Sequence, residues 1–177
     1  MKILETPLEG LIVFEPSFYK DERGAFYESW REVEYERYGI KETFVQDNLS
    51  FSHKNVLRGL HYQENQGQLV TIIKGTIFDV VVDIRPASPT FKKYFSIELS
   101  SDQPRQLYMP PGFAHGFYVL SDDVIMHYKC TQYYDHSREG GILWSDSEIN
   151  IKWPLVSHPI VGKRDLNFGK IDDFLKG

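Results

Sequence analysis

Two histidines of this sequence lie in motifs whose residue types could carry chemistry. His61 lies in the motif RGLHYQ, and His115 lies in the motif PPGFAHGF. Histidine has an ordinary pKa near ~6.5, which makes it the side chain best matched to proton transfer at neutral pH, and His61 is the candidate for this role. Arg58 and His61 differ by an odd number of positions, so a regular strand directs them to opposite faces, and Gly59 is where a bulge would correct this. The alternative for His61 is a histidine that makes only structural hydrogen bonds at a strand end.

Tyrosines supply the next group of candidates, in the motif YKCTQYY. Tyr128 and Tyr134 share the same parity and would face one side of a strand, whereas Tyr133 would face the other. A phenol directed into a cavity can donate a proton, and a second ring can stack on a nucleobase. Cross-strand aromatic packing is the alternative, so this motif alone does not decide a function.

The elements that carry these residues are predicted to be short strands, because β-branched and aromatic runs end at Gly, Pro, Asn or Asp. The predicted strands are Leu11–Glu15, Ala25–Trp30, Thr43–Ser52, Val56–Gln63, Leu69–Lys74, Thr76–Arg85, Tyr94–Leu99, Gln106–Met109, Gly116–Leu120 and Val124–Tyr134. In the segment Thr76–Arg85, alternation predicts one face in the core and one face on solvent or a cavity. Only Arg31–Arg37 and Ile171–Lys176 suggest helices. The pattern predicts an all-β sandwich or barrel with short peripheral helices.

Composition and length predict one globular domain over residues 1–177. Hydrophobic residues make up 41% and charged residues 25%, which argues against disorder, and the net charge of -5 comes without a basic block, which argues against a nucleic-acid partner. The lone Cys130 excludes an intramolecular disulfide and fits a reducing cytoplasm. No signal peptide and no apolar run of about 18 residues is present, so we expect no membrane association and a cytoplasmic location. The sequence contains no glycine-rich phosphate-binding loop, so we do not expect nicotinamide or ATP chemistry.

The run Pro110-x-Gly112-x-x-His115 resembles the second motif of the cupin superfamily, which presents a histidine into a β-barrel. Metal-binding cupins supply a His-x-His pair from their first motif, and this chain has Gly59 in place of one of those histidines, leaving His61 alone. One or two histidines are too few ligands for a zinc, iron or manganese site unless carboxylates complete it. We therefore expect a cupin-like barrel without a metal.

In order along the chain, six motifs resemble the dTDP-4-dehydrorhamnose 3,5-epimerase family, and together they span nearly its whole length. The motifs are DERGAFYE (21–28), FVQDNLS (44–50), RGLHYQ (58–63), VVDIRPASPTF (81–91), PGFAHGF (111–117) and YKCTQYY (128–134). The resemblance implies a cupin-like β jelly roll, an isomerase that needs no cofactor, and a homodimer. The implied substrate is a nucleotide diphosphate linked to a 4-keto-6-deoxy sugar, in deoxysugar biosynthesis of the rhamnose type.

The implied reaction inverts carbons beside a ketone. A C4 ketone acidifies the hydrogens on C3 and C5, so a base can remove one and an acid can return a proton to the opposite face. By resemblance His61 is the base and Tyr128 is the acid. The carboxylate that orients the imidazole would be Asp165, with Asp83 as second choice.

The resemblance also assigns residues that hold the substrate. These are Arg23, Glu28, Gln46, Asp47, Asn48, Arg58, Gln68, His115, Tyr134, Glu139 and Arg164, with Tyr134 stacked on the base. Arg164 replaces a more usual lysine and keeps its positive charge. Gln68 replaces a lysine of the family's Gln-Gly-Lys and loses the charge, which would cost roughly tenfold in rate without compensation. Our hypothesis is that Gln68 marks a changed substrate or a changed set of inverted carbons.

Three other functions stay open at this point. A nucleotide-sugar 3,4-ketoisomerase would also use a histidine base but would move the carbonyl. A non-catalytic cupin that binds nucleotide sugars would need no proton transfer at all. A metal-dependent cupin oxygenase or isomerase would contain stoichiometric metal.

Overall fold

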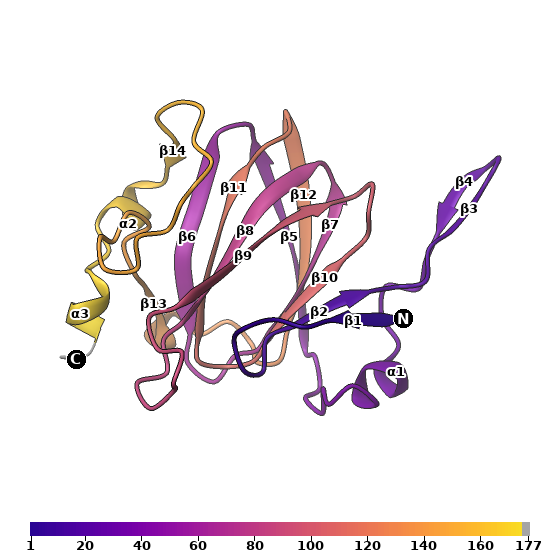
Figure 1. Ribbon diagram of the computed structural model, residues 1–177, viewed down its shortest axis with the longest axis horizontal. Helices are drawn as coiled ribbons and strands as arrows, with labels where there is room; N and C mark the ends of the chain where they lie inside the picture. The colour runs from indigo at the N-terminus through magenta and orange to yellow at the C-terminus, as the bar shows by residue number, and fades with distance from the viewer. Residues whose placement is uncertain (175–177) are drawn as a thin grey trace.

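The computed structural model describes residues 1–174 as two facing β-sheets with short helices at the periphery (Figure 1). The first sheet has the order β1-β2-β10-β7-β12-β5, and the second has the order β13-β6-β11-β8-β9 with β14 beside β6. The first sheet consists of β1 (Lys2–Leu4), β2 (Ile12–Glu15), β10 (Gln106–Met109), β7 (Gln68–Lys74), β12 (Asp123–Cys130) and β5 (Gln46–His53). The second consists of β13 (Glu139–Gly141), β6 (Val56–Gln63), β11 (Phe113–Val119), β8 (Thr76–Asp83), β9 (Tyr94–Ser100) and β14 (Ile160–Val161). This arrangement confirms the predicted all-β jelly roll.

The main core lies between the two sheets. It consists of apolar side chains that alternate along the strands, among them Val70 and Ile72 of β7, Val81 of β8 and Met126 of β12, all buried. Inward residues on β7 and β12 meet inward residues on β8 and β11, because side chains of one parity on each strand face the opposite sheet. The core therefore fixes which face of each strand can line a cavity.

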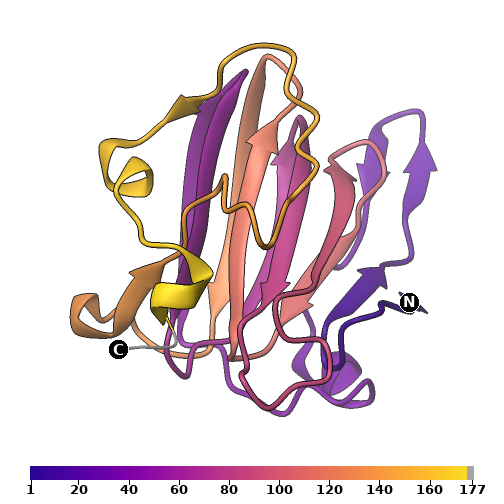
Figure 2. The same cartoon turned by 60° about the vertical axis from the view of Figure 1, so that its left-hand side comes forward.

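Strand β8 departs from the prediction, because both of its faces are buried. Val80 and Val82, on its outer face, pack with Ile142, Ile149 and Ile171. Those residues belong to the chain after β13, which crosses the outer face of the second sheet (Figure 2). The prediction that one face of this strand meets solvent or a cavity is wrong for the outer side. Alternation alone could not reveal the covering segment.

The bulge expected at Gly59 is present where β6 pairs with β11. His61 lies opposite His115, but Arg58 lies opposite Phe117, so three positions on β6 match two on β11. Gly59 has φ +125, and a Cβ atom there would lie 2.5 Å from the Cα of Gly116. Only glycine fits this backbone and this approach, and the extra residue brings Arg58 and His61 to one cavity.

Short elements surround the sandwich. They are the hairpin β3 (Tyr19–Asp21) with β4 (Gly24–Phe26), the helices α1 (Glu32–Glu36), α2 (Lys163–Leu166) and α3 (Ile171–Phe174), and the 3-10 turn η1 (His136–Arg138). The predicted strand Ala25–Trp30 is mostly wrong, since β4 ends at Phe26. The two predicted helices are present, although the end of Ile171–Lys176 lies outside the described residues. In Figure 1 the β3–β4 hairpin projects away from the two sheets.

Candidate active site

A cavity of about 270 Å³ opens between the two sheets. The first sheet contributes Gln46 and Asn48 of β5 and Tyr128 of β12, and the second contributes Arg58 and His61 of β6 and His115 of β11. The volume is close to the lower end of the range for small-molecule sites, and the polar residues are concentrated within it. This cavity is the candidate active site.

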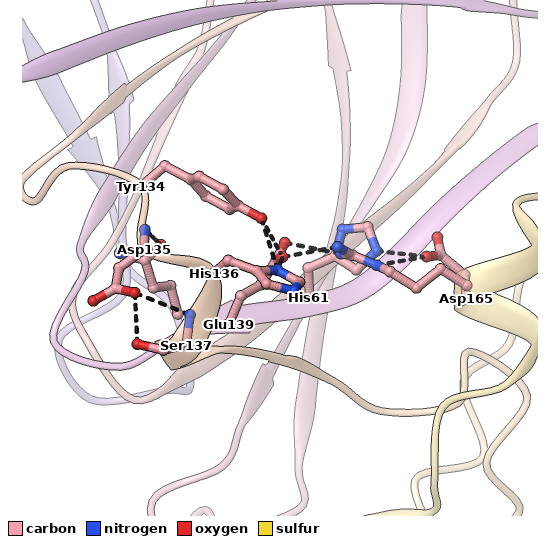
Figure 3. Close-up of polar contacts among 9 residues, drawn as sticks. His61, Tyr134, Asp135, His136, Ser137, Glu139 and Asp165 are labelled. Carbon is pink, nitrogen blue, oxygen red and sulfur yellow. Dashed lines mark hydrogen bonds and ion pairs between the residues drawn. The ribbon is translucent and has the colours of Figure 1, made fainter.

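His61 forms a hydrogen-bonded pair with a buried carboxylate. Its Nε2 lies 2.8 Å from Oδ1 of Asp165 on α2 (Figure 3). The backbone N–H of Gly59 donates to Oδ2 of the same carboxylate at 3.0 Å. Burial raises the pKa of Asp165, but these two hydrogen bonds and the nearby charges of His61 and Arg164 outweigh it and hold the pKa below its ordinary value. The carboxylate is therefore ionised and accepts the proton of Nε2. Nδ1 remains as the free ring nitrogen.

Tyr128 reaches the cavity from the opposite sheet. It is partly buried on β12, and burial raises the pKa of its phenol, against the opposing charge of Arg58. The phenol keeps its proton at neutral pH and can donate it. His61 and Tyr128 thus stand on facing walls of one cavity.

One rim of the cavity is formed by a network of three side chains. The Tyr134 hydroxyl donates to Oε2 of Glu139 at 2.9 Å (Figure 3). Arg164 donates to both carboxylate oxygens of Glu139, at 2.7 and 2.8 Å. Burial raises the pKa of Glu139, but the hydrogen bonds from Arg164 and Tyr134 outweigh it and lower the pKa overall. The Tyr134 ring is 54% exposed, so it can stack on a nucleobase. The neighbouring guanidinium of Arg164 can bind a phosphate.

Below this network, Asp135 holds the turn that follows Tyr134. Its carboxylate accepts from the backbone N–H and the hydroxyl of Ser137, at 2.9 and 2.6 Å, and so caps η1 (Figure 3). Gln63 accepts from the backbone N–H of Asp135. The cavity floor and the rim are therefore joined by hydrogen bonds.

Arg58 is held in place by the first sheet. Its Nε donates to the Ser52 hydroxyl at 3.0 Å and its Nη2 donates to the Phe51 carbonyl at 3.1 Å. It lines the cavity together with Arg164, and no lysine is among the lining residues within the described part of the chain. Gln68 also lines the cavity, and its amide donates to Oε1 of Gln66 at 2.9 Å. Lys74 is not among the lining residues; it is exposed and lies 4.0 Å from Asp123.

Three of the substrate-binding residues assigned by resemblance lie outside this cavity, namely Arg23, Glu28 and Asp47. Arg23 and Glu28 belong to the projecting hairpin and the segment after it, where Arg23 pairs with Asp21 and Glu28 pairs with Arg31. The carboxylate of Asp47 points to the outer face of the first sheet and accepts from Lys129 at 2.7 Å.

Asp83 is not the carboxylate that contacts His61. It is fully buried and accepts hydrogen bonds from Arg85, Ser88 and Thr90, which lower its pKa to about 2 against the effect of burial. It therefore organises the turn after β8, and the second choice for the orienting carboxylate is corrected to Asp165 alone.

Some lining residues were not identified from the sequence. Ser50, Met126 and Cys130 line the cavity, and each shares parity with a residue that was assigned. Alternation along β5 and β12 is the signal that could have identified them. Asp79 contacts His115, but alternation could not single it out. Any charged residue on an alternating strand has the same pattern.

Within residues 1–174 no group of three or more His, Cys, Asp and Glu side chains is arranged to hold a metal ion. In the same part of the chain, no helix combines the length and the apolar character that crossing a membrane requires.

Comparisons with known proteins give the same picture. The model of the family described as dTDP-4-dehydrorhamnose 3,5-epimerase matches residues 5–173. The chain belongs to this family.

Relatives of the chain in the family extend over its full length. A dTDP-4-dehydrorhamnose 3,5-epimerase from Shigella flexneri is 48% identical, over 98% of this chain and 97% of the relative. The structure of a dTDP-6-deoxy-D-glucose-3,5-epimerase from Legionella pneumophila, in complex with dTDP-4-keto-L-rhamnose, is 45% identical with a TM-score of 0.94, over 97% of this chain and 93% of that chain. A 3'-monoepimerase from Streptomyces bikiniensis, in complex with dTDP-quinovose, is 29% identical with a TM-score of 0.91, over 97% and 88% of the two chains. The proteins similar to this chain thus include enzymes named as 3,5-epimerases and one named as a 3'-monoepimerase.

Proposed function

We propose that this protein epimerises C3, C5 or both in a dTDP-linked 4-keto-6-deoxy sugar, as part of deoxysugar biosynthesis. The observation that carries the proposal is the cavity in which the His61–Asp165 pair faces Tyr128 across the two sheets. The family membership of the whole chain supports the same reaction.

In the proposed reaction His61 is the base. Asp165 accepts the Nε2 proton, so Nδ1 carries the lone pair and removes the hydrogen from C3 or C5. The electrons of the broken C–H bond move to the C4 oxygen and form an enolate. The Tyr128 hydroxyl then gives its proton to the opposite face of the same carbon, and the ketone is restored with inverted configuration. Exchange with water returns the proton to Tyr128 and removes it from His61.

The charged groups of the cavity fit an anionic substrate. Arg58 lies beside His61, where a fixed cation stabilises negative charge on the enolate oxygen. Arg164 and Tyr134 stand at the rim, where a diphosphate and a base would be met. Gln46 and Asn48 supply neutral hydrogen-bonding groups from β5.

The number of inverted carbons depends, in this proposal, on Gln68. Its amide is neutral and already donates to Gln66, so the enolate formed beside it receives less stabilisation than a lysine would give. If one of the two enolates depends on that charge, one epimerisation becomes slow. A single inversion is therefore the second candidate, and it has a precedent in the 3'-monoepimerase.

A homodimer is also part of the proposal. Leu49, Phe51 and Ile73 on the outer face of the first sheet are 58%, 65% and 51% exposed, which is unusual for large apolar side chains grouped together. β5 is also an edge strand. The projecting hairpin carries Arg23 away from the cavity of its own chain, and in a dimer it would supply this residue to the partner.

The proposed location is the cytoplasm, in line with a single buried cysteine that forms no disulfide within the described chain.

Proton NMR in deuterated water tests the proposed function. Incubation of dTDP-4-keto-6-deoxyglucose with the protein is expected to place deuterium at C3, C5 or both. A moved carbonyl would indicate a ketoisomerase instead. No exchange and no turnover would contradict the proposal, whether or not the nucleotide sugar binds.

A further inference from the structure

A second histidine–carboxylate pair lies beside the first. His115 lies directly opposite His61 in the pairing of β11 with β6, and its Nε2 is 2.8 Å from Oδ2 of Asp79 on β8. His115 lines the cavity, and Asp79 does not. Asp79 therefore reaches the cavity only through the imidazole.

The surroundings of Asp79 are unusual for a carboxylate. Asp79 is 0% exposed, and it shares parity with Ile77 and Val81, which belong to the apolar core between the sheets. Its Oδ1 is the one buried side-chain nitrogen or oxygen in residues 1–174 without a hydrogen-bond partner. An unpaired buried acceptor of this kind destabilises the fold, because no hydrogen bond compensates for its lost hydration.

Asp83 provides the comparison within the same strand. It lies four positions later with the same parity, it is equally buried, and its two oxygens accept from Arg85, Ser88 and Thr90. Where a buried carboxylate organises the backbone of this strand, all of its acceptor capacity is used. Asp79 has a single partner, so holding the imidazole of His115 is its one evident interaction.

We infer that Asp79 is a positioning residue of the active site: it fixes the orientation and tautomer of His115, so that Nδ1 of this ring meets the sugar beside His61. The inference rests on the proposed function. A ring nitrogen bonded to a carboxylate oxygen carries its proton there, which leaves Nδ1 as the atom available to the cavity. Both cavity histidines then present the same ring atom to the substrate.

The test compares Asp79→Asn with Asp83→Asn in the deuterium-exchange assay. Asparagine fills the same volume but can turn its amide NH₂ toward Nε2 and reverse the tautomer of the ring. For Asp79→Asn we expect kcat to fall by about 10- to 100-fold, with KM within about threefold of the wild type, since a misplaced group near the reacting carbon acts on the transition state. The melting temperature of Asp79→Asn should equal or exceed that of the wild type. Asp83→Asn should be less stable but retain its kcat below its melting temperature.

A double-mutant cycle with His115→Gln separates positioning from a general structural effect. If Asp79 acts through His115, adding Asp79→Asn to His115→Gln should lower kcat no further. Nitrogen-15 NMR of the ring should also show a changed tautomer for His115 in Asp79→Asn, with the His61 signal unchanged. Two independent, multiplying losses of kcat would overturn the inference, as would wild-type kcat in Asp79→Asn. A wild-type protein without exchange activity would instead contradict the proposed function, and the ring tautomer would still test the inference.

Discussion

At the scale of the residue, the proposed chemistry depends on which ring atom each histidine presents to the substrate. The Asp165 carboxylate accepts the Nε2 proton of His61 and is itself held by the Gly59 N–H. These contacts give the imidazole one orientation and one tautomer. No local pattern indicated this contact, because Asp165 is 104 positions from His61. The family resemblance offered Asp165 and Asp83 as the carboxylate that orients His61, and the structure places Asp165 there.

Asp165→Asn should therefore lower kcat by about 10²- to 10³-fold, because the amide can stabilise the wrong tautomer of His61. Initial rates of solvent exchange measure this effect. Asp122→Asn, at a side chain that is 92% exposed, is the matched control and should match the wild type. An Asp165→Asn protein with half of the wild-type rate would show that the pair does not act in proton transfer.

Gln68→Lys tests the second residue-scale claim. A charged amine at this position should increase exchange at the slower of C3 and C5 by roughly tenfold and so change the ratio of the products. NMR resolves the two positions. Lys74→Gln, which removes an exposed amine outside the cavity, should change neither rate. An unchanged product ratio and substrate choice in Gln68→Lys would refute the role given to Gln68.

At the scale of the element, alternation predicted the strands of the sandwich well because each has one face in a shared core. Val56–Gln63 and Gln106–Met109 match β6 and β10 at both ends. The bulge at Gly59 was also predicted. By contrast β14 has two residues and α2 has four, and both are placed by contacts with distant strands rather than by local pattern. Asp79 and Asp83 have the same pattern, and only their partners distinguish their roles.

The turn after β8 offers a prediction for stability. Asp83 has a pKa of about 2 in the folded chain against about 3.8 unfolded, so its contribution is fully present above the unfolded value and is lost as pH falls toward 2. Between pH 5 and pH 2 the free energy of unfolding of the wild type should fall by about 2 kcal/mol more than that of Asp83→Asn. Urea titrations at each pH measure the difference. Parallel curves for the two proteins would contradict this role.

At the scale of the whole molecule, the cavity lacks Arg23 and Glu28, which the resemblance assigned to the substrate. Their position on or beside the projecting hairpin is explained if two chains share their sites. The sequence of one chain could not predict such sharing. An exposed apolar residue such as Phe51 looks the same in the sequence whether it contacts solvent or a partner chain.

Phe51→Glu should convert the proposed homodimer into monomers, because it places a charge within the apolar outer face of the first sheet. Analytical ultracentrifugation measures the mass, and the exchange assay should show a loss of activity that follows dissociation. Val156→Glu is the control: Val156 is 78% exposed and lies in the segment that covers the other sheet. A monomeric wild-type protein with full activity would contradict the dimer.

The central claim is that His61 removes the proton from the sugar. The most direct measurement follows deuterium entry into dTDP-4-keto-6-deoxyglucose by NMR, with wild-type protein and His61→Asn side by side, after dTDP binding has been measured for both. We predict that the variant binds dTDP as the wild type does and loses exchange at both C3 and C5 by at least about 10²-fold. Exchange by His61→Asn at the wild-type rate, at either carbon, would show that another group is the base there.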